Sequence, residues 1–217
     1  MSAKIISITA TMALAILFAH AKADIITYSD FAVFDGAADI ALAEDFESVP
    51  VAYNTALSSF SNNGLTYSGV SSSPFSPNVW IASPGYTNFG IPGPTTSSIL
   101  TATGNEDFLV IDVAPDQTAI GFNTYLNDFG DVTVTVTEID GQVTVFDYYH
   151  DPEDVGFLGV IADDAIASLQ WTAQGGEKIN TGIDNVYAGT TPVPEPATIS
   201  LLGFSLCALA LYRRRKR

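Results

Sequence analysis

Two groups of acidic and amide side chains have the chemistry of calcium ligands. Glu44, Asp45 and Glu47 lie near the start of the central region, and Asp184 and Asn185 lie near its end. Calcium binds six to eight oxygen atoms from carboxylates, amides and backbone carbonyls. If the first and last strands of the fold are neighbours, the two groups meet. The sequence therefore predicts a structural calcium site, with exposed acids on a very acidic surface as the alternative.

Three aromatic residues have the chemistry to bind sugar. Trp80, Tyr86 and Phe89 lie in a stretch, 68–98, that is rich in Pro, Ser and Gly. Aromatic faces with polar neighbours suit neutral glycans, so the three residues are a candidate platform. The alternative is that they hold an ordered loop against the domain, as buried aromatic residues commonly do.

Candidates for catalysis are few. His150 stands beside Asp151, but the sequence has no Gly-x-Ser-x-Gly elbow, so we interpret it as an exposed histidine near a turn. Glycoside hydrolysis needs a pair of carboxyl groups, and among 24 acidic residues a suitable pair is expected by chance. We predict a protein without catalytic residues, and a secreted polysaccharide-active hydrolase is the alternative.

The charge of the chain is very unevenly distributed. Between Asp24 and Pro196, one lysine, Lys178, stands against all 24 acidic residues, which gives a formal charge of −23. Such a domain repels phosphate backbones, so nucleic acid is excluded as a partner, whereas neutral glycans and divalent cations remain. The only cysteine, Cys207, lies near the end of the chain, so the central region has no disulfide or cysteine metal site.

The central region has the pattern of an all-β domain. Short runs rich in β-branched and aromatic residues, separated by turn residues, predict strands at 24–34, 64–69, 79–82, 99–103, 108–113, 119–126, 155–162, 166–173 and 183–188. An alanine-rich segment, 37–43, indicates at most a short helical turn. We therefore predict an antiparallel β-sandwich, jelly-roll-like, over residues 24–189.

The best-defined element is a hairpin at 131–149. Valines and threonines alternate along its first strand, and Asp140-Gly141 predicts a two-residue turn. If Ile139 pairs with Gln142, the valines at 132, 134, 136, 143 and 145 share one face. The threonines then share the other face with Phe146 and Tyr148.

The last 28 residues, 190–217, have three parts. Pro194-Glu195-Pro196 forms a turn that helices do not cross, and an uncharged apolar run predicts a short membrane helix at about 197–212. Five bases then end the chain as a membrane stop that stays in the cytoplasm: Arg213, Arg214, Arg215, Lys216 and Arg217. By length alone a buried core helix would compete, but five consecutive bases cannot follow a helix into a core.

This order of motif, span and basic tail resembles the PEP-CTERM sorting tail of bacterial exported proteins. The resemblance implies that exosortase, a membrane protease, recognises and removes the tail. It also implies a diderm, exopolysaccharide-producing bacterium. The mature protein would leave the inner membrane for the cell surface or the extracellular matrix.

The other end of the chain, residues 1–23, has the features of a secretory signal peptide. Lys4 is followed by an apolar run, and Ala21 and Ala23 fit the small-x-small rule for signal peptidase. The alternative is an uncleaved N-terminal anchor.

Two segments of the central region resemble β-sandwich domains that often precede PEP-CTERM tails. Asp45-Phe46-Glu47 with the glycine-flanked strand at 64–69 is similar to their first strands, and Gly182-Ile183-Asp184-Asn185-Val186 is similar to their last. Some of these domains are similar to galactose-binding-like or lectin-like jelly rolls. The combined expectation is an exported, non-catalytic surface or matrix protein that binds extracellular polysaccharide, with a calcium-bridged adhesive protein as another alternative.

Overall fold

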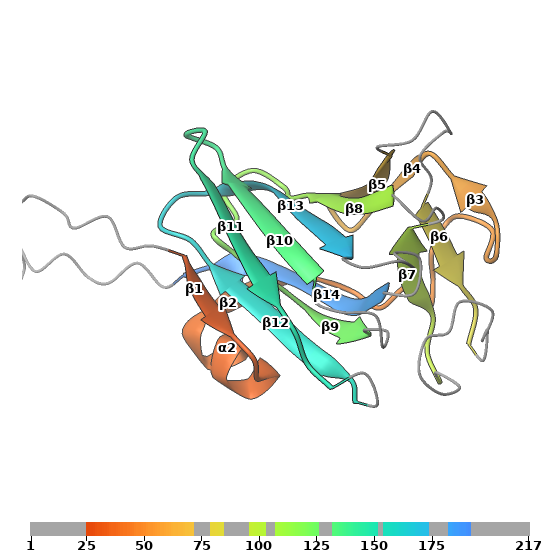
Figure 1. The fold of residues 1–217 in the computed structure, drawn as a ribbon, viewed down its shortest axis with the longest axis horizontal. Helices are drawn as coiled ribbons and strands as arrows, with labels where there is room; N and C mark the ends of the chain where they lie inside the picture. The colour runs from red at the N-terminus through yellow and green to blue at the C-terminus, as the bar shows by residue number, and fades with distance from the viewer. Residues whose placement is uncertain are drawn as a thin grey trace, which may run out of the picture.

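The computed structural model describes residues 25–71, 79–84, 96–102, 107–125, 132–151, 154–173 and 182–191. They form two antiparallel sheets packed face to face, with one short helix on the outside (Figure 1). The predicted β-sandwich is confirmed.

Eight strands form the larger sheet and six form the smaller one. The larger sheet has the order β1-β12-β9-β14-β7-β6-β3, with β2 also paired to β14, and the smaller has the order β11-β10-β13-β8-β5-β4. The bounds in the larger sheet are β1 Ile26–Tyr28, β2 Asp39–Glu44, β3 Ala56–Leu57, β6 Val79–Ala82, β7 Ile99–Ala102, β9 Ala119–Tyr125, β12 Gly156–Ile161 and β14 Gly182–Thr190. Those in the smaller sheet are β4 Ser59–Asn62, β5 Leu65–Ser71, β8 Asp107–Asp112, β10 Val132–Glu138, β11 Val143–Tyr148 and β13 Ile166–Ala173.

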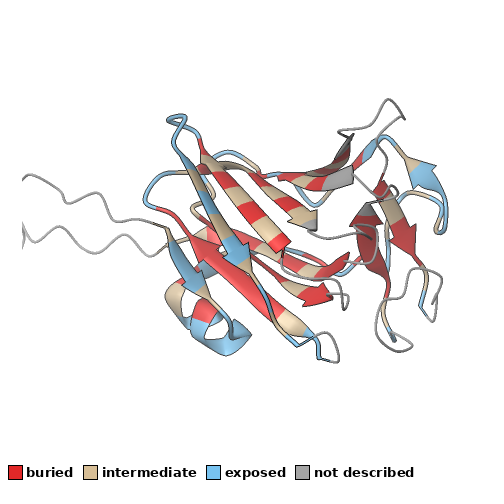
Figure 2. Ribbon diagram, viewed as in Figure 1, coloured by how far each residue is buried: buried red, intermediate tan, exposed pale blue. Residues whose placement is uncertain are grey.

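The core lies between the two sheets, where their inner faces are buried (Figure 2). In β10, the fully buried valines at 132, 134 and 136 alternate with half-buried threonines, the pattern of a strand with one face inward. The rings of Phe122 and Trp171 meet edge to face at 5.5 Å. Because the described residues contain no cysteine, their stability depends on this burial, at about 1.5–3 kcal/mol for each large apolar side chain.

The β10–β11 hairpin forms as predicted, but its register differs by one residue. Val136 pairs with Thr144 and Val134 with Phe146, so the predicted pairing of Ile139 with Gln142 is wrong. Instead the Glu138 N–H donates to the Gln142 carbonyl at 2.9 Å. This leaves a three-residue loop, 139–141, in which Gly141 has a φ of 88°. A three-residue loop ending in a left-handed glycine is the next most common hairpin after the two-residue turns.

The shifted register reverses the faces of β11. Phe146 and Tyr148 point inward beside the buried valines of β10, whereas Val143 and Val145 are 58% and 59% exposed. A slip of one residue moves every side chain of a strand to the other face of the sheet, because strand side chains alternate. The predicted five-valine face is therefore wrong for the second strand.

The N-terminal segment also differs from the prediction. After β1, the helix α2 spans Phe31–Ala37, where a strand was expected, and β2 occupies the alanine-rich segment, where a helical turn was expected. Asp30 caps the helix, since its Oδ1 accepts a hydrogen bond from the Val33 N–H at 3.0 Å. Pairing of β2 with β14 overrides the helix propensity of alanine.

Helix α2 lies on the outer face of the larger sheet (Figure 1). Its fully buried Phe34 packs where β9 and β12 carry Gly121 and Gly159. A Cβ atom on Gly159 would lie 2.5 Å from Phe34 Cδ2, so the glycine makes room for the ring.

β14 changes its partner halfway along. Residues 182–183 pair with β7, and residues 186–190 pair with β2 on the same edge. Asp184 and Asn185 therefore face a gap between the end of β2 and the start of β7. The last strand is thus a neighbour of the second strand, β2, whereas the first strand, β1, pairs with β12.

The first and last described strands end on the same side of the sandwich. Ile26 pairs with Ile161, Ile161 with Ala119, and Ala119 with Gly189, so the four residues form one row across the sheet. Three strand spacings separate Ile26 from Gly189, which is about 14 Å. Both described ends of the chain therefore leave the domain near each other.

The signal peptide and the C-terminal tail lie outside the described residues. Within the described part of the chain, no helix is long and apolar enough to cross a membrane.

Candidate functional site

The gap between the end of β2 and the start of β7, beside β14, is the place where three of the predicted calcium ligands come near one another. Asp184 borders the gap, and Glu47 from the loop that follows β2 binds Ser98 beside it. The charge of Asp45, in the same loop, acts on Asp184. Glu44 and Asn185 adjoin the same gap: Asn185 donates hydrogen bonds to Asp184, and Glu44 has partners outside the site. The site therefore exists because β14 pairs with β7 at its start and with β2 over the rest of its length.

A single buried aromatic residue orients the loop after β2. Phe46 is fully buried with a φ of 57°, and its ring lies edge to face with Phe60 and Tyr67 at 6.3 and 5.3 Å. Tyr53 fixes this turn by donating its hydroxyl hydrogen to the Phe46 carbonyl at 2.9 Å. With Phe46 directed into the core, the neighbouring Asp45 and Glu47 are exposed.

Glu44 is buried and serves the loop itself. Its Oε1 accepts a hydrogen bond from the Phe46 N–H at 2.8 Å, and its Oε2 accepts hydrogen bonds from the Asn62 and Asn63 amides. The carboxylate thereby ties the end of β2 to the turn between β4 and β5. Glu44 is therefore a predicted calcium ligand with a structural role of its own.

Asp184 is 1% exposed and has a dense set of hydrogen bonds. Its Oδ2 accepts from the Ser97 hydroxyl at 2.7 Å and from the Asn185 amide at 2.9 Å, and its Oδ1 accepts from the Asn185 N–H at 2.6 Å. Burial raises the pKa of Asp184 to about 6, and the charges of Glu47 and Asp45 add to the rise. The hydrogen bonds from Ser97 and Asn185 act in the opposite direction.

Glu47 is held by the residue next to Ser97. The Ser98 N–H donates to Glu47 Oε1 at 2.6 Å, and the Ser98 hydroxyl donates to Oε2 at 3.3 Å. Sequence reasoning missed both serines, since nothing in their composition separates them from the other serines of the 68–98 stretch. The segment just before β7 thus holds the carboxylates of β14 and of the loop after β2 close together.

The site is strongly negative. The residues that the structure describes include no lysine or arginine, so no such cation offsets Asp45, Glu47 and Asp184 there. In the same part of the chain, no three His, Cys, Asp or Glu side chains converge closely enough to hold a metal ion. The carboxylates of Glu47 and Asp184 are instead stabilised by hydrogen bonds from serine and asparagine donors.

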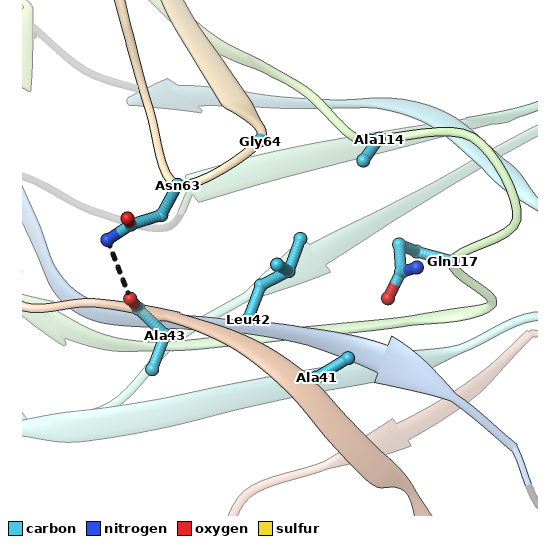
Figure 3. A pocket seen from close by; sticks show the side chains of 7 residues that line it. All are labelled: Ala41, Leu42, Ala43, Asn63, Gly64, Ala114 and Gln117. Atoms are coloured by element: carbon cyan, nitrogen blue, oxygen red, sulfur yellow. Dashed lines mark hydrogen bonds between the residues drawn. The ribbon is translucent and has the colours of Figure 1, made fainter.

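A pocket of 440 Å³ adjoins the site at the turn between β4 and β5 (Figure 3). Asn63 donates to the Ala43 carbonyl at 3.0 Å across its rim, and Figure 3 shows Leu42 extending from β2 toward this turn. Gln117 lines the opposite wall, and its buried Oε1 has no hydrogen-bond partner in the described part of the chain. The described lining of this pocket is mostly apolar, with Asn63 and the unsatisfied Gln117 as its polar residues, and it contains no charged or nucleophilic side chain.

The candidate glycan platform is only partly described. Trp80 lies on β6, paired with Ala56 and Thr101, and is half-buried. Since Val79 and Ile81 on either side belong to the core, Trp80 points to the outer face of the larger sheet. Tyr86 and Phe89 lie outside the described residues, so whether the three form a platform remains a prediction.

His150 is packed rather than freely exposed. Its Nδ1 lies 2.8 Å from the Asp151 carbonyl, and its ring meets Tyr148 edge to face at 5.8 Å. A Cβ atom on Gly156 would lie 2.3 Å from His150 Cδ2, so the histidine fills the space beside a glycine. This half-buried position replaces the fully exposed one that we expected.

Comparison with known proteins identifies the C-terminal tail. Residues 192–217 match the model of the PEP-CTERM protein-sorting motif. The motif implies an exported protein that an exosortase sorts and processes at the membrane. No curated protein matches the chain.

Among solved structures, the chain is similar to a glycoside hydrolase family 43 arabinoxylan arabinofuranohydrolase from Bacillus subtilis, determined in complex with cellotetraose. The sequences are 16% identical and the TM-score is 0.34. The match covers 58% of this chain and 27% of that one, so this chain spans about a quarter of its length. Similarity at this level assigns neither fold nor activity.

Proposed function

We propose that the mature chain is a non-catalytic protein of the cell surface or the extracellular matrix that binds a neutral polysaccharide. The sorting motif carries the proposal, because it begins at Pro192, immediately after the described domain ends at Thr191. The common end of β1 and β14 supports it, since the precursor would be held to the inner membrane by one end of the sandwich. The opposite end would face away from the membrane. A galactose-binding-like or lectin-like identity is part of the same proposal.

Removal of the tail by exosortase can be tested with a triple variant and a single variant of the full chain. In a host that carries an exosortase, signal peptidase and exosortase would shorten the chain at both ends, which mass spectrometry measures. Replacing Pro194, Glu195 and Pro196 by alanine should leave the tail in place and the protein in the inner membrane. Pro192→Ala, two residues before the Pro-Glu-Pro triplet, is the matched control and should be processed normally. Processing of the triple variant at the wild-type rate would refute the exosortase assignment.

A calcium-stabilised domain is a second candidate, favoured by the hydrogen bonds that hold Asp184 and Glu47 to the consecutive residues Ser97 and Ser98, with the charge of Asp45 acting on Asp184. An ion would have to draw these carboxylates closer together, because the described residues hold no ready-made cluster. Three carboxylates from two distant segments repel one another there without a lysine or arginine among the described residues. A calcium ion with neighbouring serine and backbone oxygens would offset this repulsion. It would also stabilise the fold by about 1.4 kcal/mol at ten times its Kd.

Thermal melts of the full chain in mild detergent test this candidate. Millimolar calcium should raise the melting temperature, a chelator should reverse the rise, and sodium chloride of equal ionic strength should not reproduce it. Asp184→Asn should abolish the rise, whereas Asp163→Asn, at an exposed turn, should keep it. If sodium chloride raises the melting temperature equally, or if both variants keep the rise, these carboxylates do not bind calcium and are only part of an acidic surface.

A further inference from the structure

We propose that a groove between β1 and β11 is the polysaccharide-binding site. β1 is an edge strand of the larger sheet and β11 is an edge strand of the smaller one, and a cavity of 310 Å³ lies between them. Thr27 and Ser29 line it from the β1 side, Phe146 and Tyr148 from β11, Leu158 from β12, and Tyr149 beyond the end of β11. This inference depends on the glycan binding proposed above and gives that binding a location.

The aromatic wall of the groove follows from the register of the β10–β11 hairpin. Because Phe146 pairs with Val134 and Tyr148 with Val132, both rings point between the sheets. At the open edge of the sandwich they stay half-buried instead of closing into the core. The groove is therefore a direct consequence of the one-residue difference from the predicted register.

Tyr148 is fixed before any ligand arrives. Its hydroxyl donates to the Phe157 carbonyl at 2.9 Å and lies 3.2 Å from Thr124 Oγ1, and its ring lies 5.8 Å from that of Trp171. A ring held by these three contacts loses little conformational freedom on binding, which favours affinity.

The mouth of the groove combines an exposed aromatic ring with hydroxyl groups. Tyr149 is 57% exposed, and Thr27 and Ser29 are exposed on the facing strand. A sugar ring presents an apolar C–H face and a rim of hydroxyl groups. Aromatic rings can cover the face, and a few polar groups can fix the orientation of the rim. The lining thus matches both parts of a sugar.

Charge restricts the ligand to a neutral polymer. Among the described residues that line the cavity, Asp147 is the charged one, in a domain whose formal charge is −23. Anionic polysaccharides and nucleic acids are repelled by such a surface. At 310 Å³ the cavity is near the lower end of the usual range of about 300–1,000 Å³, so it suits one or two units of a longer chain.

A peptide strand fits the groove less well. Strand addition depends on main-chain hydrogen bonds along an exposed edge, and β1 offers only three residues, Ile26–Tyr28. A peptide paired with the edge of β11 would run along the outside of that strand. It would leave the rings of Phe146 and Tyr148 uncovered.

Calorimetric titration of the full chain in mild detergent tests the groove. The probes are hexasaccharides of glucose, xylose, mannose and galactose, with an alginate hexasaccharide as the anionic control and an arrayed library of extended peptides. Tyr149→Ala should weaken the best neutral ligand at least ten-fold, since aromatic residues are prominent among the side chains whose truncation weakens binding most. Val145→Ala is the matched control, because Val145 is 59% exposed on the same hairpin strand but does not line the cavity, and it should bind like wild type.

Each other outcome contradicts the inference in a different way. If Tyr149→Ala and wild type bind the glycan with equal affinity, the groove is not the binding site, although the protein still binds glycan. A loss of glycan affinity in Trp80→Ala alone would show that the binding site is on the outer face of β6. Failure of every neutral hexasaccharide at millimolar concentration would overturn both the groove and the proposed glycan binding, and peptide capture in its place would assign the groove to a protein partner.

Discussion

Ser97 donates its hydroxyl hydrogen to Asp184 Oδ2 over 2.7 Å, at the point where β14 exchanges β7 for β2. The neighbouring Ser98 binds Glu47 through its N–H, so two consecutive residues hold two carboxylates of like charge. This arrangement keeps a buried acid close to other acids within the domain. The repulsion among these acids should lower the free energy of unfolding in a pH-dependent way.

The first prediction concerns that pH dependence. The folded-state pKa of Asp184 is raised to about 6 from 3.8, so the native state holds the proton more tightly than the unfolded chain. Stability from this group is therefore full below about pH 4 and is lost as the pH rises to about 6. Asp184→Asn should remove this loss. Relative to wild type, the variant should gain about 1 kcal/mol between pH 4 and pH 7, after allowance for screening by water.

Urea unfolding of wild type and variant from pH 4 to pH 7 measures the effect. Asp163→Asn, in an exposed turn, controls for the loss of one negative charge. Parallel curves for wild type and Asp184→Asn would contradict the raised pKa.

Most of the fold was predictable because strands leave a strong local pattern. The alternation of valine and threonine at 132–137 and the runs at 156–161 and 166–173 mark their strands without reference to any partner. The proximity of Asp184 to the 45–47 loop depends on the pairing of β2 with β14, whereas the sequence analysis made it conditional on the first and last strands being neighbours, and the first strand, β1, pairs with β12.

The errors arose where long-range pairing or turn geometry decides the structure. The alanine-rich β2 is a strand only because β14 pairs with it. Asp140-Gly141 fits both a two-residue turn and the end of a three-residue loop, and the choice reverses a whole strand. Ser97 and Ser98 become site residues only through contacts with segments far away in sequence.

The second prediction tests the hairpin register. Val145 is 59% exposed and Val134 is fully buried, although the pattern of the sequence treats the two alike. Val145→Thr should change the free energy of unfolding by less than about 0.5 kcal/mol. Val134→Thr should cost about 1–3 kcal/mol, because it places a hydroxyl group in the core. Equal costs in urea unfolding would restore the register that the sequence predicted.

The third prediction compares two glycines in open space. No heavy atom lies within 4 Å of a Cβ built on Gly141 or on Gly36, but only Gly141 has a left-handed φ, at 88°. Gly141→Ala should therefore destabilise the protein by about 1 kcal/mol through backbone strain alone. Gly36→Ala, within α2, should stabilise it by up to about 1 kcal/mol. Differential scanning calorimetry should show melting shifts of opposite sign, and shifts of the same sign would contradict the turn geometry.

The fourth prediction concerns the contact between α2 and the larger sheet. Alanine at position 159 would place its Cβ 2.5 Å from Phe34 Cδ2 and 3.0 Å from Phe157 Cε1. These rings pack in one cluster, with centroids 5.5 Å apart, so neither can move without disturbing the other. Gly159→Ala should cost about 1–3 kcal/mol, as overpacking of a filled site usually does. Phe34→Ala removes the ring atoms Cδ2 and Cγ that the new Cβ would meet, so the double variant should be less destabilised than the sum of the two single variants. A double-mutant cycle by urea unfolding measures this coupling. Strict additivity would mean that α2 does not pack on Gly159.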